Sequence, residues 1–272
     1  MATTIYTPLM LRNGTRGVPE IPLSSTSYLL DNYPVGSLGS AYSLRKISTV
    51  FTGDCIRVRR SSDNAELDIG FIAGELDTTS LQTFIGVNTG HVIYWWDQSG
   101  NGNNIENTNV LIQPEIITSG TLNTLNGKPA IVFANDNLVA DGTAPTLTQP
   151  YTFVAVNKSF NGYSWMSNAA GYPKVGQFSS YIYWNYGQAT YSYSTFLGDG
   201  NQHIVSGMFD GATSKLWGDN GIEISSDATT GDYRFGNFGN NGVHQEFIMF
   251  DTDRESDISD INDAVNDYYG SY

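Results

Sequence analysis

The sequence is poor in cysteine, in basic residues and in long apolar runs. Cys55 is the only cysteine among 272 residues, so no intrachain disulfide can form and stability must come from packing or assembly. Because Cys55 stands at the start of an alternating apolar run, we expect a buried small residue and not a nucleophile. No apolar stretch reaches the roughly 18 residues of a membrane span, and no charged segment followed by an apolar one marks a secretory signal.

Lysine and arginine number 13 against 27 aspartates and glutamates, for a net charge of −14. Residues 1–60 hold seven basic and three acidic residues, so the acidic excess lies entirely in residues 61–272. A body this acidic is repelled by nucleic-acid backbones and by anionic membrane surfaces. We therefore expect neither nucleic acid nor a membrane among its partners.

Aromatic residues and glycine are abundant: the chain has 17 Tyr, 13 Phe, 5 Trp and 29 Gly. This composition favours strands joined by tight turns, and strand-like runs recur from residue 41 to residue 250. One short helix is expected at 78–84 behind an Asp77 cap. A second is expected to follow a Ser256 cap and to stop at Gly270. Many strands with two short helices predict an antiparallel sandwich or jelly roll.

Residues 1–40 differ from the rest of the chain. Prolines and glycines interrupt them, and their apolar residues follow neither a strand nor a helix period, which predicts an extended arm. Residues 41–272 are expected to form one domain. The apolar side chains with which the arm would attach to an assembly are Ile5, Leu9, Leu11, Val18, Ile21 and Leu23.

Segments 41–46, 56–65, 68–71, 96–103 and 126–130 carry a resemblance to known proteins. In this order and spacing they resemble the first half of the catalytic domain of α-L-arabinofuranosidase B, and also a block found in bacteriophage structural proteins. The second half is similar to laminin-G and concanavalin-type domains. The resemblance implies an all-β, concanavalin A-like (laminin-G-like) antiparallel jelly-roll β-sandwich with short helices and an extended N-terminal arm.

Arabinofuranosidases of this type use a glutamate nucleophile and an aspartate acid, with adjacent cysteines upstream. A retaining glycosidase needs both carboxylates. The matching positions here hold Ser180 and Asn240, and the cysteine pair falls near Trp165 and Met166. Because neither a hydroxyl nor an amide replaces a carboxylate in that chemistry, the resemblance predicts a protein that is not an enzyme.

Aromatic residues near the expected catalytic strand suggest a carbohydrate groove. The candidate ligand-binding residues are Trp165, Tyr181, Tyr183, Trp184 and Asn240. Aromatic faces stack on sugar rings, but the same residues also fill cores and subunit interfaces, and the second interpretation is the simpler one.

Other polar features have structural interpretations. His91, His203 and His244 lack metal-ligand spacing and are expected to be sheet residues. The loop at 97–103 holds oxygen ligands of the kind that Ca²⁺ takes, but we favour a turn whose side chains bond its own backbone. The basic cluster at 45–60 is expected to pair with nearby acidic residues. No metal or other cofactor is predicted.

These observations together predict a non-enzymatic bacteriophage virion protein: a capsid decoration, a head or tail fibre, or a baseplate component. It would be made in the bacterial cytoplasm and exposed on the virion as a homo-oligomer. Its arm would bind other virion proteins and its surface would touch glycans. The alternatives are a glycoside hydrolase resembling α-L-arabinofuranosidase and a free carbohydrate-binding module.

Overall fold

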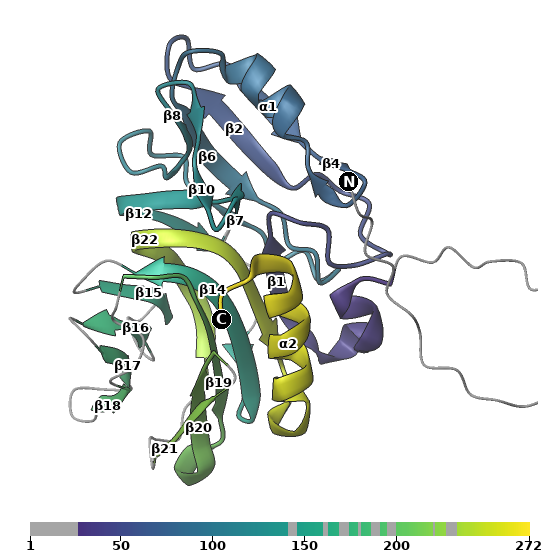
Figure 1. Cartoon of the computed structure of the whole chain (residues 1–272), viewed down its shortest axis with the longest axis vertical. Helices are drawn as coiled ribbons and strands as arrows, with labels where there is room; N and C mark the ends of the chain where they lie inside the picture. The colour runs from purple at the N-terminus through teal and green to yellow at the C-terminus, as the bar shows by residue number, and fades with distance from the viewer. Residues whose placement is uncertain are drawn as a thin grey trace, which may run out of the picture.

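The computed structural model describes residues 27–140, 146–159, 163–168, 174–178, 181–185, 191–194, 200–219, 221–226 and 233–272. The six apolar residues predicted to anchor the arm, from Ile5 to Leu23, lie outside these ranges. The boundary predicted between residues 40 and 41 stays a prediction. The described chain is almost entirely β-structure, which confirms the predicted all-β sandwich of antiparallel sheets (Figure 1).

One antiparallel sheet has the order β1–β22–β14–β19–β20–β21. Its strands are β1 (Leu38–Ser43), β14 (Tyr151–Ser159), β19 (His203–Phe209), β20 (Ser214–Gly218), β21 (Ile222–Ser226) and β22 (Tyr233–Phe250). Ile248 at its centre lies between Ala41 of β1 and Val154 of β14. Both faces of this part of the sheet are buried, so its strands are almost continuously apolar.

A second group of strands joins the first through β12 and β22. It consists of β2 (Ile56–Arg60), β3 (Glu66–Ile69), β6 (Gly90–Trp95), β7 (Ile105–Glu106), β8 (Glu115–Thr118), β9 (Thr121–Leu122) and β12 (Ile131–Ala140). β2 pairs with β3 and β6, β6 pairs with β7 and β8, and both of these pair with β12. β12 then pairs with the first half of β22, which continues into the other sheet.

Shorter strands complete the ladder. The pairs are β4 (Phe71–Ile72) with β5 (Glu75–Leu76), β10 (Thr124–Leu125) with β11 (Lys128–Pro129), and β13 (Thr146–Leu147) with the start of β22. A meander of β15 (Tyr163–Asn168), β16 (Lys174–Phe178), β17 (Tyr181–Asn185) and β18 (Tyr191–Ser194) adjoins β22 through β15.

An aromatic core fills the space between the sheets. Phe238 is its hub: its ring lies 5.9 Å from Trp95, 5.8 Å from Phe133 and 5.3 Å from Phe247, centroid to centroid. All four side chains are almost fully buried. Edge-to-face and tilted contacts of this kind add to the free energy of burying the rings.

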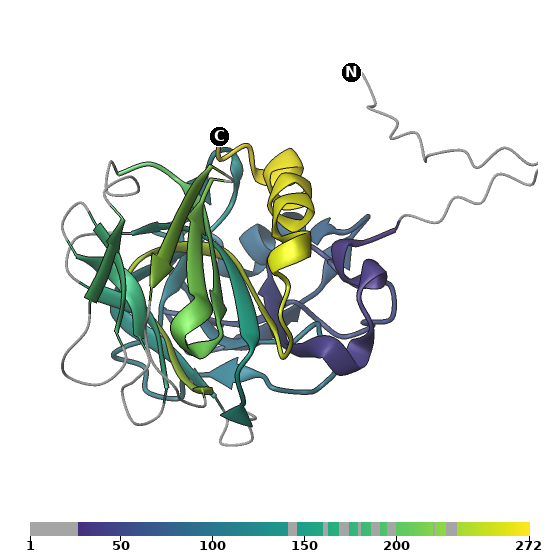
Figure 2. The same ribbon diagram turned by 90° about the horizontal axis from the view of Figure 1, so that it is seen from below.

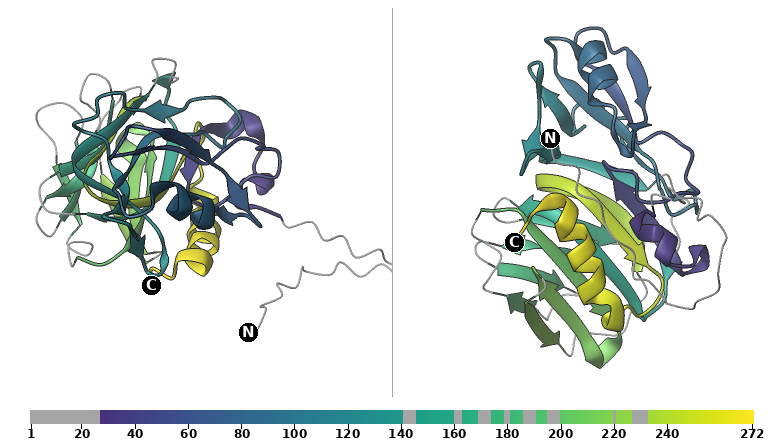
Figure 3. Two further views of the ribbon diagram at one scale, coloured as in Figure 1. Left: turned by 90° about the horizontal axis from the view of Figure 1, so that it is seen from above. Right: turned by 45° about the vertical axis from the view of Figure 1, so that its right-hand side comes forward.

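Helix α2 (Ile258–Tyr269) covers the outer face of the first sheet, as Figure 2 and both views of Figure 3 show. Its Ile261, Val265 and Tyr269 pack in a second apolar cluster with residues of β1, β14, β19 and β22. The predicted stop at Gly270 is confirmed, with φ +62° and its N–H bonded to Asn266. The expected Ser256 cap is not used, because a 3-10 turn, η4 (Glu255–Asp257), precedes the helix.

The other helices are α1 (Thr78–Ile85) and the short 3-10 turns η1 (Leu29–Asn32), η2 (Val35–Ser37) and η3 (Gly211–Thr213). α1 confirms the predicted helix: the Asp77 side chain accepts a hydrogen bond from the N–H of Ser80. No helix within the described ranges is both long and apolar enough to cross a membrane.

Candidate active site

The ladder between β12 and β22 carries a bulge at a polar position. Ala134 lies opposite Asn241 and Asp136 lies opposite Asn240, so Asn135 between them is extra. Asn135 has φ +65°, a left-handed conformation that asparagine tolerates better than most residues. The bulge is held by the N–H of Asn135, which donates to the Asn241 side chain at 2.8 Å. Bulges occur often beside active sites, where they redirect a side chain.

Gly239 lets the two strands approach closely at this bulge. It has φ +123°, and a Cβ there would lie 2.9 Å from the carbonyl oxygen of Asp136 and closer still to the ring of Phe133. No real Cβ fits at those separations, so a glycine is required by both space and backbone conformation. The sequence therefore fixes the position of Asp136 through a residue on the neighbouring strand.

The Asp136 carboxyl has a raised pKa. Its partial burial is the main cause, and the negative charge of Glu115 adds to it. The N–H of Ala134, which donates to Asp136 at 2.8 Å, and the nearby His91 act in the opposite direction. A carboxyl that holds its proton to a higher pH is suited to general acid catalysis.

Glu115 and His91 come from strands adjacent to the bulge. Glu115 of β8 lies opposite both Val132 of β12 and His91 of β6 in the ladder. The Glu115 carboxylate accepts a hydrogen bond from the Thr118 hydroxyl at 2.6 Å. The result is a protonatable carboxyl with a second carboxylate near it, the two groups on which glycoside hydrolysis depends.

Sequence reasoning missed Asp136 because it placed the acid on the wrong strand. The family pattern pointed to position 240, which holds an asparagine, whereas the carboxyl belongs to the strand paired with it. A signal was present: Asn135, Asp136 and Asn137 interrupt an otherwise apolar strand. Polar residues within a strand between buried neighbours often mark a bulge or a site.

The predicted groove residues fall on three neighbouring strands. Trp165 lies on β15, Asn240 on β22, and Tyr181, Tyr183 and Trp184 on β17. The sheet order β22–β15–β16–β17 brings their backbones into one surface next to the bulge. Ser180, at the expected nucleophile position, lies outside the described residues. The ligand-binding role of these residues stays a prediction.

The basic cluster pairs internally, as expected. Arg57 binds Asp68 at 2.5 Å and Arg60 binds Asp63 at 2.6 Å on the surface. Arg45 reaches across the fold to Glu246, 2.9 Å away, whose side chain is fully buried. The cluster is therefore part of the framework.

Cys55 and the loop at 97–103 also take the predicted structural roles. The Cys55 thiol is buried, which raises its pKa, and it donates to the carbonyl of Ser43. In the loop, Asp97 accepts hydrogen bonds from the N–H groups of Ser99 and Asn103, both at 2.9 Å. Within the described ranges, no group of three or more His, Cys, Asp or Glu side chains is placed to hold a metal.

All three histidines lie on strands, as predicted. His91 is on β6, His203 on β19 and His244 on β22. His203 contacts Asp219, with 2.5 Å between Nδ1 and the carboxylate. His244 is fully buried, and burial lowers its pKa to about 3.

No protein-family model matches the sequence, and no curated protein matches it. The chain is similar in structure to a glycoside hydrolase family 54 α-L-arabinofuranosidase solved with a cyclic sulfate inhibitor. The TM-score is 0.64 at 15% identity, over 84% of this chain and 62% of that one. An arabinofuranosidase complexed with arabinofuranosyl-α-1,2-xylobiose gives a TM-score of 0.60 with the same identity and coverage. A sialidase of Trypanosoma rangeli, at a TM-score of 0.45, is too distant to support an argument.

These similarities confirm the arabinofuranosidase-like part of the resemblance at the level of the fold. The chain spans less than two thirds of the length of those enzymes. They contradict the predicted non-enzymatic virion protein, because the solved structures that share the fold are glycoside hydrolases. The inference that the chain is not an enzyme was wrong in its reasoning as well. It relied on two positions, Ser180 and Asn240, and overlooked the carboxyl opposite the second.

Proposed function

We propose that this protein is a glycoside hydrolase that acts on α-L-arabinofuranosyl groups, with Asp136 as the proton donor. One observation carries the proposal: Asp136, a carboxyl of raised pKa, lies directly opposite Asn240 in a fold shared with arabinofuranosidases. The acid has thus moved to the partner strand within the same part of the sheet.

In the proposed reaction, the bond between the anomeric carbon and the leaving oxygen breaks. Asp136 gives its proton to that oxygen, and water supplies the hydroxyl that ends on the sugar. Glu115 has two roles in this scheme: its negative charge helps keep Asp136 protonated, and it stabilises the positive charge that develops on the sugar ring. The aromatic strands β15 and β17 would contribute the surface along which the rest of the glycan lies.

The test is hydrolysis of 4-nitrophenyl α-L-arabinofuranoside and of an arabinose-branched xylan by the wild-type chain, by Asp136→Asn and by Asp260→Asn. Asp260 is an exposed aspartate on α2, far in sequence from the bulge, and serves as the control. We expect turnover by the wild type and by the control, and a loss of about 10²–10⁴-fold on the xylan for Asp136→Asn. A wild-type chain that binds these sugars and releases no arabinose would instead be a carbohydrate-binding module.

The remaining predictions about partners stay untested. They include the homo-oligomer, contacts made by residues 1–40, and the exclusion of nucleic acid and membranes.

A further inference from the structure

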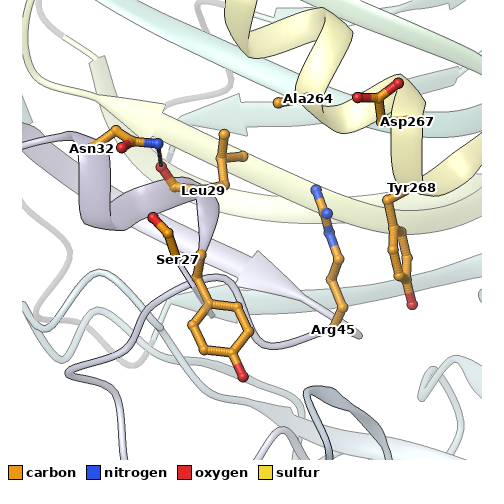
Figure 4. A pocket seen from close by; sticks show the side chains of 8 residues that line it. Ser27, Leu29, Asn32, Arg45, Ala264, Asp267 and Tyr268 are labelled. Atoms are coloured by element: carbon orange, nitrogen blue, oxygen red, sulfur yellow. Dashed lines mark hydrogen bonds between the residues drawn. The ribbon is translucent and has the colours of Figure 1, made fainter. Parts of the chain in front are cut away.

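A pocket of about 320 Å³ opens between η1, Arg45 and α2, where the described chain begins. Figure 4 shows the Arg45 guanidinium extending between Leu29 and Tyr268, with Ala264 and Asp267 of α2 beyond it. The volume lies in the range of small-molecule sites. None of the residues that line it belongs to the candidate active site.

Arg45 is rigidly placed and incompletely bonded. Its Nε and Nη2 donate to Glu246 at 2.9 and 3.0 Å, and its guanidinium lies 4.4 Å from the centre of the Tyr268 ring. Within the described chain, the third nitrogen, Nη1, donates to no acceptor. The Arg45 side chain is 13% exposed, so a preorganised donor remains available at the pocket.

The other polar groups of the pocket offer acceptors. The Asn32 amide nitrogen makes one long bond, of 3.5 Å, to the carbonyl of Leu29, and its oxygen accepts none from the described chain. Asp267 is exposed on α2, and its carboxylate likewise has no hydrogen-bond donor among the described residues. Ser27 adds a hydroxyl that both donates and accepts.

Charge selects between classes of ligand. Glu246 already compensates the charge of Arg45, and Asp267 adds a negative charge to the lining. An anion would therefore meet no net positive charge here. A neutral molecule with hydroxyl groups can accept from Arg45 and donate to Asn32 and Asp267, while its C–H groups contact Leu29 and Ala264.

From this arrangement we infer that the pocket is a second carbohydrate site, which holds one neutral sugar ring of an oligosaccharide away from the active site. The choice of a sugar rests on the proposed function. The expected benefit is retention of a polymeric substrate, since a second contact raises the effective concentration of the glycan near the enzyme.

The test is a titration of the ¹⁵N-labelled full chain with L-arabinose, D-xylose and an arabinose-branched xylo-oligosaccharide, followed by amide chemical shifts. We expect shifts at Asn32, Arg45 and Asp267. Ala264→Trp, which fills the pocket from an exposed helix position, should abolish them. Asp267→Ala should weaken binding about tenfold, and Asp260→Ala on the same helix should leave it unchanged.

Three results would overturn the inference: no shift at these residues with any of the sugars, undiminished binding by both pocket variants, or shifts only around Asn101 and Asn103, which line a different pocket. Hydrolysis of the small aryl arabinofuranoside separates this inference from the proposed function. A chain that binds sugar here without hydrolysing it keeps the second site and loses the enzyme. A chain that hydrolyses the aryl substrate but shows no shifts here keeps the enzyme and loses the site.

Discussion

Asp136 and Asn240 face each other across the β12–β22 ladder, next to a bulge that Gly239 makes sterically possible. The carboxyl and the amide therefore occupy one register position on paired strands. A comparison restricted to one strand would find only the amide.

The first prediction concerns the stability conferred by protonating Asp136. Its folded-state pKa is raised, so the stabilising contribution is fully present below the unfolded pKa of 3.8 and is lost as pH rises through the folded value. Asp136→Asn removes that loss, while its amide oxygen can still accept from Ala134. The melting temperature of Asp136→Asn relative to wild type should therefore increase between pH 3 and pH 6.

Asp63 provides a control of opposite sign. Its hydrogen bond from Arg60 holds its pKa at about 2, so it stabilises the fold above the unfolded pKa and loses this effect as pH falls towards 2. Asp63→Asn should therefore lose stability relative to wild type between pH 3 and pH 6. The same trend in both variants would contradict the assignment of a raised pKa to Asp136.

The second prediction concerns His244, which is buried against Phe133 and Phe238, with ring centroids 5.1 and 4.8 Å away. Neither ring nitrogen has a hydrogen-bond partner within the described residues. Its lowered pKa means that the unfolded chain binds a proton that the folded chain refuses, so stability falls as pH drops below about 6.5. At pH 5 the loss amounts to about 2 kcal/mol.

His244→Phe removes the titrating group and keeps an aromatic ring in the core. Urea denaturation at pH 7 and pH 5 should show a smaller loss of unfolding free energy for this variant than for wild type. An equal loss in the two proteins would show that His244 does not cause the acid sensitivity.

The third prediction concerns the Arg45–Glu246 pair. Glu246→Ala leaves the largely buried Arg45 without its partner and should lower the unfolding free energy by about 3–5 kcal/mol. Arg57→Ala breaks a pair whose side chains are 41% and 36% exposed, and should cost no more than about 1 kcal/mol. Similar costs for the two variants, measured in urea, would contradict the framework role of Glu246.

The fourth prediction concerns Gly239. Gly239→Ala must relieve a clash with Phe133 and with the Asp136 backbone, so it should cost at least about 2 kcal/mol and reduce turnover. Gly102→Ala also has a positive φ, of +75°, but nothing lies near its added methyl. The control should cost only about 1–2 kcal/mol and leave turnover intact.

The sequence was sufficient to predict the sandwich, helix α1 with its Asp77 cap, and the stop of α2 at Gly270, because each depends on local periodicity or capping. The buried Cys55 and the Arg57–Asp68 pair were accessible for the same reason, since the partners are near in sequence. The bulge was not accessible. Asn135 bonds a residue 106 positions away, and the pKa of Asp136 depends on charges from two other strands.

The virion interpretation failed because it drew a functional conclusion from two substituted positions. Side chains at catalytic positions can be supplied by a neighbouring strand, and only the register of β12 against β22 shows that one is. Arg45 illustrates the same limit: its partner, Glu246, lies 201 residues away.

The most direct test of the central claim is how the loss of activity in Asp136→Asn depends on the leaving group. A nitrophenolate leaves with little protonation, whereas a sugar alcohol needs a proton from the acid. We predict that kcat/KM of Asp136→Asn falls about 10²–10⁴-fold on an arabinose-branched xylo-oligosaccharide and far less on 4-nitrophenyl α-L-arabinofuranoside. Equal losses on the two substrates, or full activity on both, would contradict the assignment of Asp136 as the proton donor.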